Sequence, residues 1–448
     1  EIRLSLVGSE MCIRDRLPIV HRVTQDAGHL FSSSPSPSTM TAPADLAAEG
    51  RVHTTEKPAK KEHTFFDDIV SMKWLVYPSS AAKFAMIFIV GYLLCEYVLP
   101  VGVNPFRPFL MLSYRIPEGE VIKRMAMEQA HGPRPTLSLD NSVTTALRSF
   151  CHSLQATLFP HQPALLRYGK GWLDVCFMAF YIIVFSFLRQ VITGHIFKPL
   201  AAHWNIKLEN KQIRFAEQGY ALTYWGIMGA VGVYVMSFQD SWWYHLDHLW
   251  YQYPHWQMRP ELKLYYLLQA SYWLQQAFVM LLGLERPRKD YYELVAHHLV
   301  TLWLIGWSYF INLTMIGTTV FVCMDIPDTW LALSKMLNYL DMNMCAAVVY
   351  STFMVVWSYF RIYLSALTLY SVYADYTLIP AYARTFHPSQ GHWLVWWMQC
   401  HVFAPLFLLL LLNLFWYVIM WRILFRAMRG VCGDMREDGE DEAPTKEE

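Results

Sequence analysis

The stretch YYELVAHHLVTLWLIGWSYFIN at 291–312 decides the fold, because it is long and apolar enough to cross a bilayer. Backbone polar groups find no water in the hydrocarbon, so such a segment spans as an α-helix. Its polar residues recur at spacings of four or seven: Glu293, His297, Thr301, Ser308 and Asn312. This spacing predicts one polar stripe on an otherwise apolar helix.

Similar apolar runs lie on both sides of this stretch. Hydrophobic residues make up 54% of the 448 residues and charged residues 16%, whereas a soluble domain usually carries about 25% charged residues. The sequence therefore predicts an all-α, polytopic integral membrane protein with about eight transmembrane helices. The candidate spans are 83–101, 171–193, 217–238, 262–284, 292–312, 315–337, 345–369 and 401–424.

Basic residues predict how the chain crosses the membrane. They gather in three regions that fall on one side if there are eight spans, and positive charge marks the cytosolic side. We therefore expect a multi-pass protein with both termini cytosolic and a long non-cytosolic loop at 102–170. The three groups are Arg189, Lys198, Lys207, Lys211 and Arg214; then Arg286, Arg288 and Lys289; then Arg422, Arg426 and Arg429.

Charge and cysteine content argue against two other classes of protein. Lys and Arg together equal Asp and Glu, so the chain lacks the basic footprint of a nucleic-acid binder. The eight cysteines form no C-x-x-C pair and no metal-finger spacing. We expect no metal site and no resident cofactor.

The charged residues within the spans are the strongest functional signal, because an ionisable group in the hydrocarbon is costly. His297 and His298 are adjacent, so about 100° of helix rotation separates their side chains. The next run, MDIPDTWLALSKMLNYLD at 324–341, places Asp325, Asp328 and Lys335 on one face. Imidazole can act as a base or a nucleophile near neutral pH, and a carboxylate bonded to one ring nitrogen would orient it. The alternative is a buried network that only joins two helices.

Other residues are candidates for binding a substrate. In the run LLQASYWLQQAFVM at 267–280, Gln269 and Gln276 share a face with Trp273 nearby. They could line a cavity or hydrogen-bond a neighbouring helix. Arg286, Arg288 and Lys289 could hold an anionic head group at the cytosolic edge, or could only anchor the helix.

Residues 284–340 resemble the Lag motif of ceramide synthases, within the TRAM–Lag–CLN8 (TLC) membrane family. The histidine pair followed by Asp-x-x-Asp on the next helix carries the resemblance, which extends from about Glu209 to Arg429 and is closest to fungal members. It implies a TLC-domain helix bundle in the endoplasmic reticulum membrane. By position, His297, His298, Asp325 and Asp328 match the family's essential residues.

The resemblance also implies an activity and partners. A ceramide synthase transfers a fatty acyl group, very long in fungal relatives, from acyl-CoA as co-substrate to the amino group of a sphingoid base such as sphinganine or phytosphingosine. Membrane lipids, a small single-pass accessory subunit and a second copy of the chain are expected partners. The resemblance further implies that the loop at 370–400 influences which acyl chain length is chosen. A non-catalytic lipid-binding or translocon-associated TLC protein is the main alternative, and an O-acyltransferase is a third.

Four regions follow from this interpretation. Residues 1–64 are expected to form a disordered tail, of which 1–16 (EIRLSLVGSEMCIRDR) resemble a sequencing-adapter artefact, with Met40 as a plausible start. Residues 65–208 would hold the first spans and 209–430 the catalytic TLC domain. Residues 431–448 would form an acidic disordered tail.

Overall fold

The fold is built from helices joined by short turns. The computed structural model describes residues 72–100, 102–129, 141–161, 163, 165–251, 253–283 and 291–428, so the predicted tails at 1–64 and 431–448 lie outside it. The α-helices are α2 (Pro78–Val98), α3 (Arg107–Leu110), α4 (Glu118–Gln129), α5 (Ser142–Leu158), α6 (Leu173–Val191), α7 (Lys198–His203), α8 (Glu209–Met236), α9 (His248–Tyr251), α10 (Pro260–Leu281), α11 (Tyr291–Phe310), α12 (Thr314–Tyr339), α13 (Asn343–Trp357), α14 (Ser365–Ala374) and α15 (Met398–Met428). The short 3₁₀ turns are η1 (Lys73–Leu75), η3 (Trp242–Tyr244), η5 (Tyr376–Leu378), η6 (Ala381–Ala383) and η7 (Pro388–Gln390), and the π-helical segments are η2 (Ile192–Phe197) and η4 (Ser358–Leu364).

Each of the eight predicted spans falls on a long helical segment. Segment α6–η2–α7 is continuous, and so is α13–η4–α14. The more polar helices α8, α10 and α11 occupy the remaining predicted spans, with 28, 22 and 20 residues. The chain is an all-α polytopic membrane protein. Within the described residues, five segments are by length and composition apolar enough to cross a bilayer: Pro78–Val98, Leu173–His203, Thr314–Tyr339, Asn343–Ala374 and Met398–Arg426.

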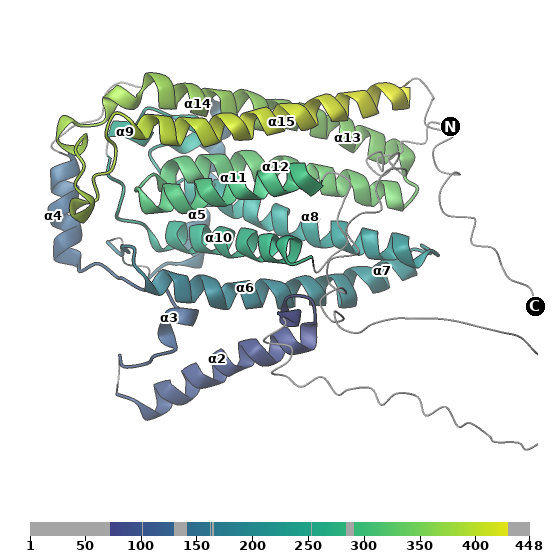
Figure 1. Cartoon of the computed structure of the whole chain (residues 1–448), viewed down its shortest axis with the longest axis horizontal. Coiled ribbons are helices and arrows are strands. Elements are labelled where there is room, and N and C mark those ends of the chain that lie inside the picture. The colour runs from purple at the N-terminus through teal and green to yellow at the C-terminus, as the bar shows by residue number, and fades with distance from the viewer. Residues whose placement is uncertain are drawn as a thin grey trace, which may run out of the picture.

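Helix α12 is the central helix of the bundle. In Figure 1, α11 and α12 run through the middle, α14 and α15 lie on one side, and α2 lies at the opposite margin. Within the most apolar stretch of each helix, 61% of the residues are buried in α12 but only 11% in α2. Polar residues can be hydrogen-bonded by protein neighbours on every face of α12, whereas α2 presents its apolar side chains to lipid.

Small residues let α8 approach α12 closely. A Cβ atom added at Gly232 would lie 2.6 Å from the Tyr265 hydroxyl and 3.0 Å from a methyl carbon of Val322. At Gly229 it would lie 3.5 Å from Ile326. Small residues at a helix interface bring backbones together in membrane bundles. Here they hold the middle of α12, which carries Asp325, against α8 and α10.

The predicted loop at 102–170 contains helices of its own. Helix α5 begins with a capping box, in which Asn141 accepts from the backbone of Thr144 and the Thr144 side chain accepts from the backbone of Asn141. Arg148 Nε donates to the Ser237 carbonyl oxygen over 3.0 Å, and His152 Nε2 lies 3.1 Å from the same oxygen. These contacts fix α5 across the end of α8.

Candidate active site

A narrow cavity runs along α11 between α10, α12 and α15. Among the described residues it is lined by His297, Thr301, Leu304, Ile305 and Ser308 of α11, Ile316, Gly317, Val320, Phe321 and Met324 of α12, Tyr266 and Trp273 of α10, and Leu406 and Leu409 of α15. The α11 residues recur every three or four positions, as one helix face requires. The wall is mostly apolar, with a few polar side chains at its ends, which suits an apolar ligand with one polar group.

The predicted polar stripe on α11 is confirmed over its central part. His297, Thr301 and Ser308 line the cavity. Glu293 is half-buried in the first turn and does not line it. Asn312 follows the helix end in the left-handed region, with φ 69°, and its side-chain amide donates to the Gly391 carbonyl oxygen over 2.8 Å. The two ends of the stripe therefore lie outside the cavity.

His297 is buried among aromatic rings. Its ring centroid lies 5.5 Å from that of Trp273, 5.4 Å from that of Trp416 and 5.8 Å from that of His298. Within the described residues, neither Nδ1 of His297 nor the hydroxyl of Thr301 makes a hydrogen bond, although both atoms are buried. Buried polar atoms are normally paired in proteins. Two unpaired ones, a helical turn apart on the cavity wall, mark a place where a polar ligand group fits.

His298 does not line the cavity, in agreement with the predicted divergence of the two histidine side chains. Its Nδ1 lies 2.8 Å from the carbonyl oxygen of Leu294, one turn earlier in α11. Its ring lies 5.4 Å from that of Trp273, on which His297 also packs. Both histidines are buried, but only His297 is among the cavity-lining residues.

The two aspartates bond to helices other than α11. Asp325, which is fully buried, accepts from Gln269 Nε2 over 2.5 Å and lies 3.5 Å from the Tyr265 hydroxyl. Gln269 in turn accepts from the Tyr224 hydroxyl over 3.0 Å. This network joins α8, α10 and α12. The prediction that an aspartate carboxylate accepts a hydrogen bond from the His297 ring is wrong for the described residues, because Met324 faces the cavity and Asp325 is rotated about 100° from it.

Asp328 pairs with an arginine that is not among the residues predicted from the sequence. Arg361 Nη2 lies 2.6 Å from Asp328 Oδ2 and donates to the Met324 carbonyl oxygen over 2.8 Å. The guanidinium lies 4.2 Å from the centre of the Trp357 ring. Arg361 is carried by η4, and π-helical segments are frequent at functional sites. A lone arginine within the apolar run at 345–369 was the signal that could have identified it.

The other predicted substrate-binding residues fall into three groups: one lines the cavity, three lie elsewhere in the bundle, and three lie outside the described residues. Trp273 lines the cavity. Gln269 and Gln276 do not: Gln269 bonds Asp325, and Gln276 Nε2 donates to Gln275 over 3.0 Å. Lys335 is half-buried near the end of α12, away from the cavity. The residues Arg286, Arg288 and Lys289 lie outside the described part of the chain.

The family model and the curated relatives that match this chain point to the same family. The family model described as the TLC domain matches residues 214–422. Sphingosine N-acyltransferase lac1 of Schizosaccharomyces pombe is 38% identical over 290 residues, covering 63% of this chain and 73% of that protein. Ceramide synthase LAG1 of Saccharomyces cerevisiae is 37% identical over 283 residues, covering 63% and 68%. Ceramide synthase hyl-2 of Caenorhabditis elegans is 26% identical over 305 residues, covering 64% and 86%.

The matched region contains all of α10, α11 and α12, together with most of α8 and α15. The cavity and the histidine and aspartate residues beside it therefore lie within the part of the chain that the TLC-domain model matches. With its helical membrane fold and this extent of similarity, the chain belongs to the Lag-type sphingosine N-acyltransferases, the ceramide synthases of the TLC-domain family.

Proposed function

We propose that the protein transfers a fatty acyl group from acyl-CoA to the amino group of a sphingoid base, and that this occurs at His297. The observation that carries the proposal is the pair of unpaired polar atoms, His297 Nδ1 and Thr301 Oγ1, on an otherwise apolar cavity wall. The cavity would hold the acyl chain, and these two side chains would contact its reacting carbonyl group.

His297 is the proposed acyl acceptor. An unprotonated ring nitrogen attacks the thioester carbonyl carbon, the carbon–sulfur bond breaks, and CoA leaves as the thiol after taking the proton that the ring loses. The amine of the sphingoid base then attacks the acyl-imidazole. The carbon–nitrogen bond to the ring breaks, and the ring regains a proton as the amide forms. Because CoA leaves before the base enters, one narrow cavity serves both substrates in turn. In the alternative, His297 is a general base and the amine attacks the thioester directly.

The two aspartates support the site from outside the cavity. Asp325 holds Gln269 and thereby α10, which carries Trp273 against the His297 ring. Asp328 and Arg361 hold the backbone of α12 at Met324, a cavity-lining residue. His298 contacts the Leu294 carbonyl oxygen of its own helix, and its ring packs on Trp273, so it would help to hold α11 against α10. These residues position the reacting ring and the cavity wall.

Orientation in the endoplasmic reticulum membrane is part of the proposal. In Figure 1, α7 and the C-terminal end of α15 lie at one end of the bundle, and α4 and the segment before α15 lie at the other. The basic residues Lys198 and Arg426 belong to the first end, which we assign to the cytosol, together with both termini. The CoA head group would then bind at Arg286, Arg288 and Lys289, beside the start of α11.

The decisive experiment uses the purified full-length protein with acyl-CoA and no sphingoid base. Mass spectrometry should find an acyl increment on the peptide that contains His297. A His297→Ala variant should lack the increment and lose several orders of magnitude in rate, as loss of a nucleophile does elsewhere. A His401→Ala variant, which alters an exposed histidine of α15, is the matched control. If the active enzyme showed no trapped acyl group, and CoA were released only after both substrates had bound, His297 would act as a general base instead.

A further inference from the structure

The polar side chains that line the cavity fall into two groups. Among the described residues, the lining includes five side chains with a nitrogen or oxygen atom: Tyr266, Trp273, His297, Thr301 and Ser308. The hydroxyls of Tyr266 and Ser308 are hydrogen-bonded to each other. In contrast, Trp273 Nε1, His297 Nδ1 and Thr301 Oγ1 are buried and have no hydrogen-bond partner within the described residues. The second group therefore combines the proposed reacting ring with an indole and a hydroxyl.

Trp273 contributes a donor without an acceptor. An indole N–H donates and does not accept, and a buried one normally finds an acceptor, as Trp250 Nε1 does with Ser371 Oγ over 2.8 Å. Three other tryptophans of the described residues also have a buried, unpaired indole nitrogen but do not line the cavity: Trp242, Trp307 and Trp357. The position of Trp273 on the cavity wall therefore distinguishes its unpaired donor from theirs.

The Trp273 ring is held in one orientation by aromatic neighbours from two helices. Its centroid lies 5.6 Å from that of Trp225 in α8. It lies 5.5 Å from the His297 ring and 5.4 Å from the His298 ring, both in α11. Because protein interiors are closely packed, the indole cannot turn toward another acceptor without displacing these rings.

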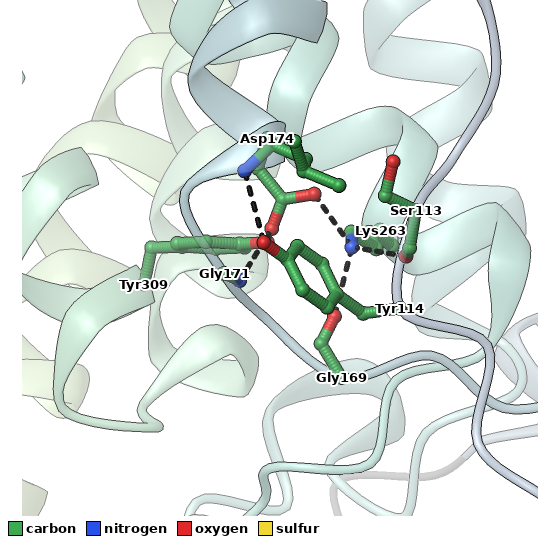
Figure 2. Close-up of polar contacts among 8 residues, drawn as sticks. Ser113, Tyr114, Gly169, Gly171, Asp174, Lys263 and Tyr309 are labelled. Atoms are coloured by element: carbon green, nitrogen blue, oxygen red, sulfur yellow. Dashed lines mark hydrogen bonds and ion pairs between the residues drawn. The ribbon is translucent and has the colours of Figure 1, made fainter. Parts of the chain in front are cut away.

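Helix α10, which carries Trp273, is itself fixed by two buried polar contacts. Near its start, Lys263 Nζ lies 2.7 Å from Asp174 Oδ1 of α6, and both side chains are almost completely buried. Figure 2 shows this ion pair, with the two side chains facing one another. In the middle of the helix, Gln269 Nε2 donates to Asp325 Oδ2 of α12 over 2.5 Å. The fold therefore sets the position of the indole.

Acyl transfer requires donors at the oxygen of the reacting carbonyl group. When a nucleophile attacks the thioester carbonyl carbon, the carbon–oxygen π bond breaks and its electron pair leaves a negative charge on the oxygen. Since the cavity wall is mostly apolar, this charge needs hydrogen-bond donors that are fixed in advance. An indole N–H and a threonine hydroxyl are both suitable donors.

We propose that Trp273 Nε1 and Thr301 Oγ1 form the oxyanion hole of the enzyme, the pair of donors that stabilises the charged oxygen beside His297. This inference rests on the proposed function. The charge is lost when the carbonyl double bond re-forms, as the carbon–sulfur bond breaks in the first step and the carbon–nitrogen bond to the ring breaks in the second. The same oxygen becomes negative if the amine attacks the thioester directly, so the inference holds for either role of His297.

Trp273→Phe tests the indole donor, because it keeps an aromatic ring beside His297 but removes the N–H group. Loss of one oxyanion donor lowers kcat by about 10²–10³-fold elsewhere, so kcat for ceramide formation should fall about a hundredfold. KM for acyl-CoA should change little, because the charge does not exist in the bound substrate. Trp416→Phe is the matched control: its ring also packs on His297, at 5.4 Å, but Trp416 does not line the cavity, so kcat should fall much less.

Thr301→Val and Thr301→Ser test the second donor independently. Valine keeps the branched shape of threonine without its hydroxyl, whereas serine keeps the hydroxyl. We expect kcat to fall strongly in Thr301→Val and much less in Thr301→Ser. Each variant is purified at full length, and its unfolding temperature is measured so that a loss of kcat is separated from a loss of folded protein.

Three results would overturn the inference. The first is a wild-type kcat in folded Trp273→Phe. The second is an equal fall in Trp273→Phe and Trp416→Phe, because ring packing would then be the cause. The third is an equal kcat in Thr301→Val and Thr301→Ser, which decides the matter even if Trp273→Phe does not fold. If the wild-type protein formed no amide product from acyl-CoA and a sphingoid base, the proposed function would fail instead.

Discussion

Replacing Arg361 by methionine should destabilise the protein strongly. The substitution leaves Asp328 in the bundle without its 2.6 Å partner and removes the donor to the Met324 carbonyl oxygen. Removing one member of a buried ion pair costs about 3–5 kcal/mol. Because 21% of the Asp328 side chain remains exposed, we expect the lower end, about 3 kcal/mol, which corresponds to a roughly hundredfold change in the folding equilibrium.

The assay is thermal unfolding of the purified protein in detergent, together with the rate of ceramide formation. The double variant Arg361→Met with Asp328→Leu removes both charges, so it should recover most of the lost stability. Arg422→Met, which alters an exposed arginine of α15, is the control and should unfold like the wild type. If Arg361→Met alone were as stable as the wild type, the reasoning from burial would be refuted. If the double variant recovered stability but not activity, the pair would have a role in the reaction as well.

Three further predictions concern regions away from the cavity. Burial lowers the pKa of Lys170 from 10.5 to about 7; the charge of Asp174 partly opposes this shift, and the charge of Lys263 adds to it. Between pH 7 and pH 10.5 Lys170 is protonated in the unfolded chain but has lost its proton in the folded protein, so the stability should rise with pH. In thermal unfolding experiments, Lys170→Met should abolish this rise. Lys263→Met should lower the free energy of unfolding by about 3–5 kcal/mol, because it leaves Asp174 buried without its ion-pair partner; an unchanged unfolding temperature would contradict this. A cysteine placed near Lys211, in a variant without reactive native cysteines, should react with an impermeant reagent from the cytosol, and one near Pro388 should not; the opposite pattern would refute the proposed orientation.

The sequence was sufficient to predict the helices and one face of α11. Apolar runs of about 20 residues fix the positions of membrane helices because the hydrocarbon leaves the backbone no other arrangement. The spacing of His297, Thr301 and Ser308 fixed their common direction, and adjacency fixed the divergence of His298. Both predictions depend on the geometry of a single helix, so no knowledge of neighbouring helices was needed.

The partners of the charged residues could not be predicted in this way. Spacing gives the direction of a side chain from its own helix axis but not which helix lies in that direction. Asp325 meets Gln269 and Asp328 meets Arg361, whereas the sequence predicts that one of the two carboxylates bonds a histidine ring. The close approach of Tyr266 to Gly317 likewise joins two helices. Such contacts are properties of the packed bundle.

The arrangement of charges also explains how an apolar substrate and charged residues share one membrane bundle. A charge on the cavity wall would have to be desolvated by the acyl chain, at a cost that grows with each bound methylene next to it. The aspartates avoid this because α12 turns Asp325 toward α10 and Asp328 toward η4, while Gly317, Phe321 and Met324 face the cavity. The charges can therefore hold the helices in register without lining the cavity. On this argument, converting the buried, cavity-lining Phe321 to aspartate should lower both the unfolding temperature and the rate of ceramide formation, because an unpaired carboxylate would be buried beside the acyl chain.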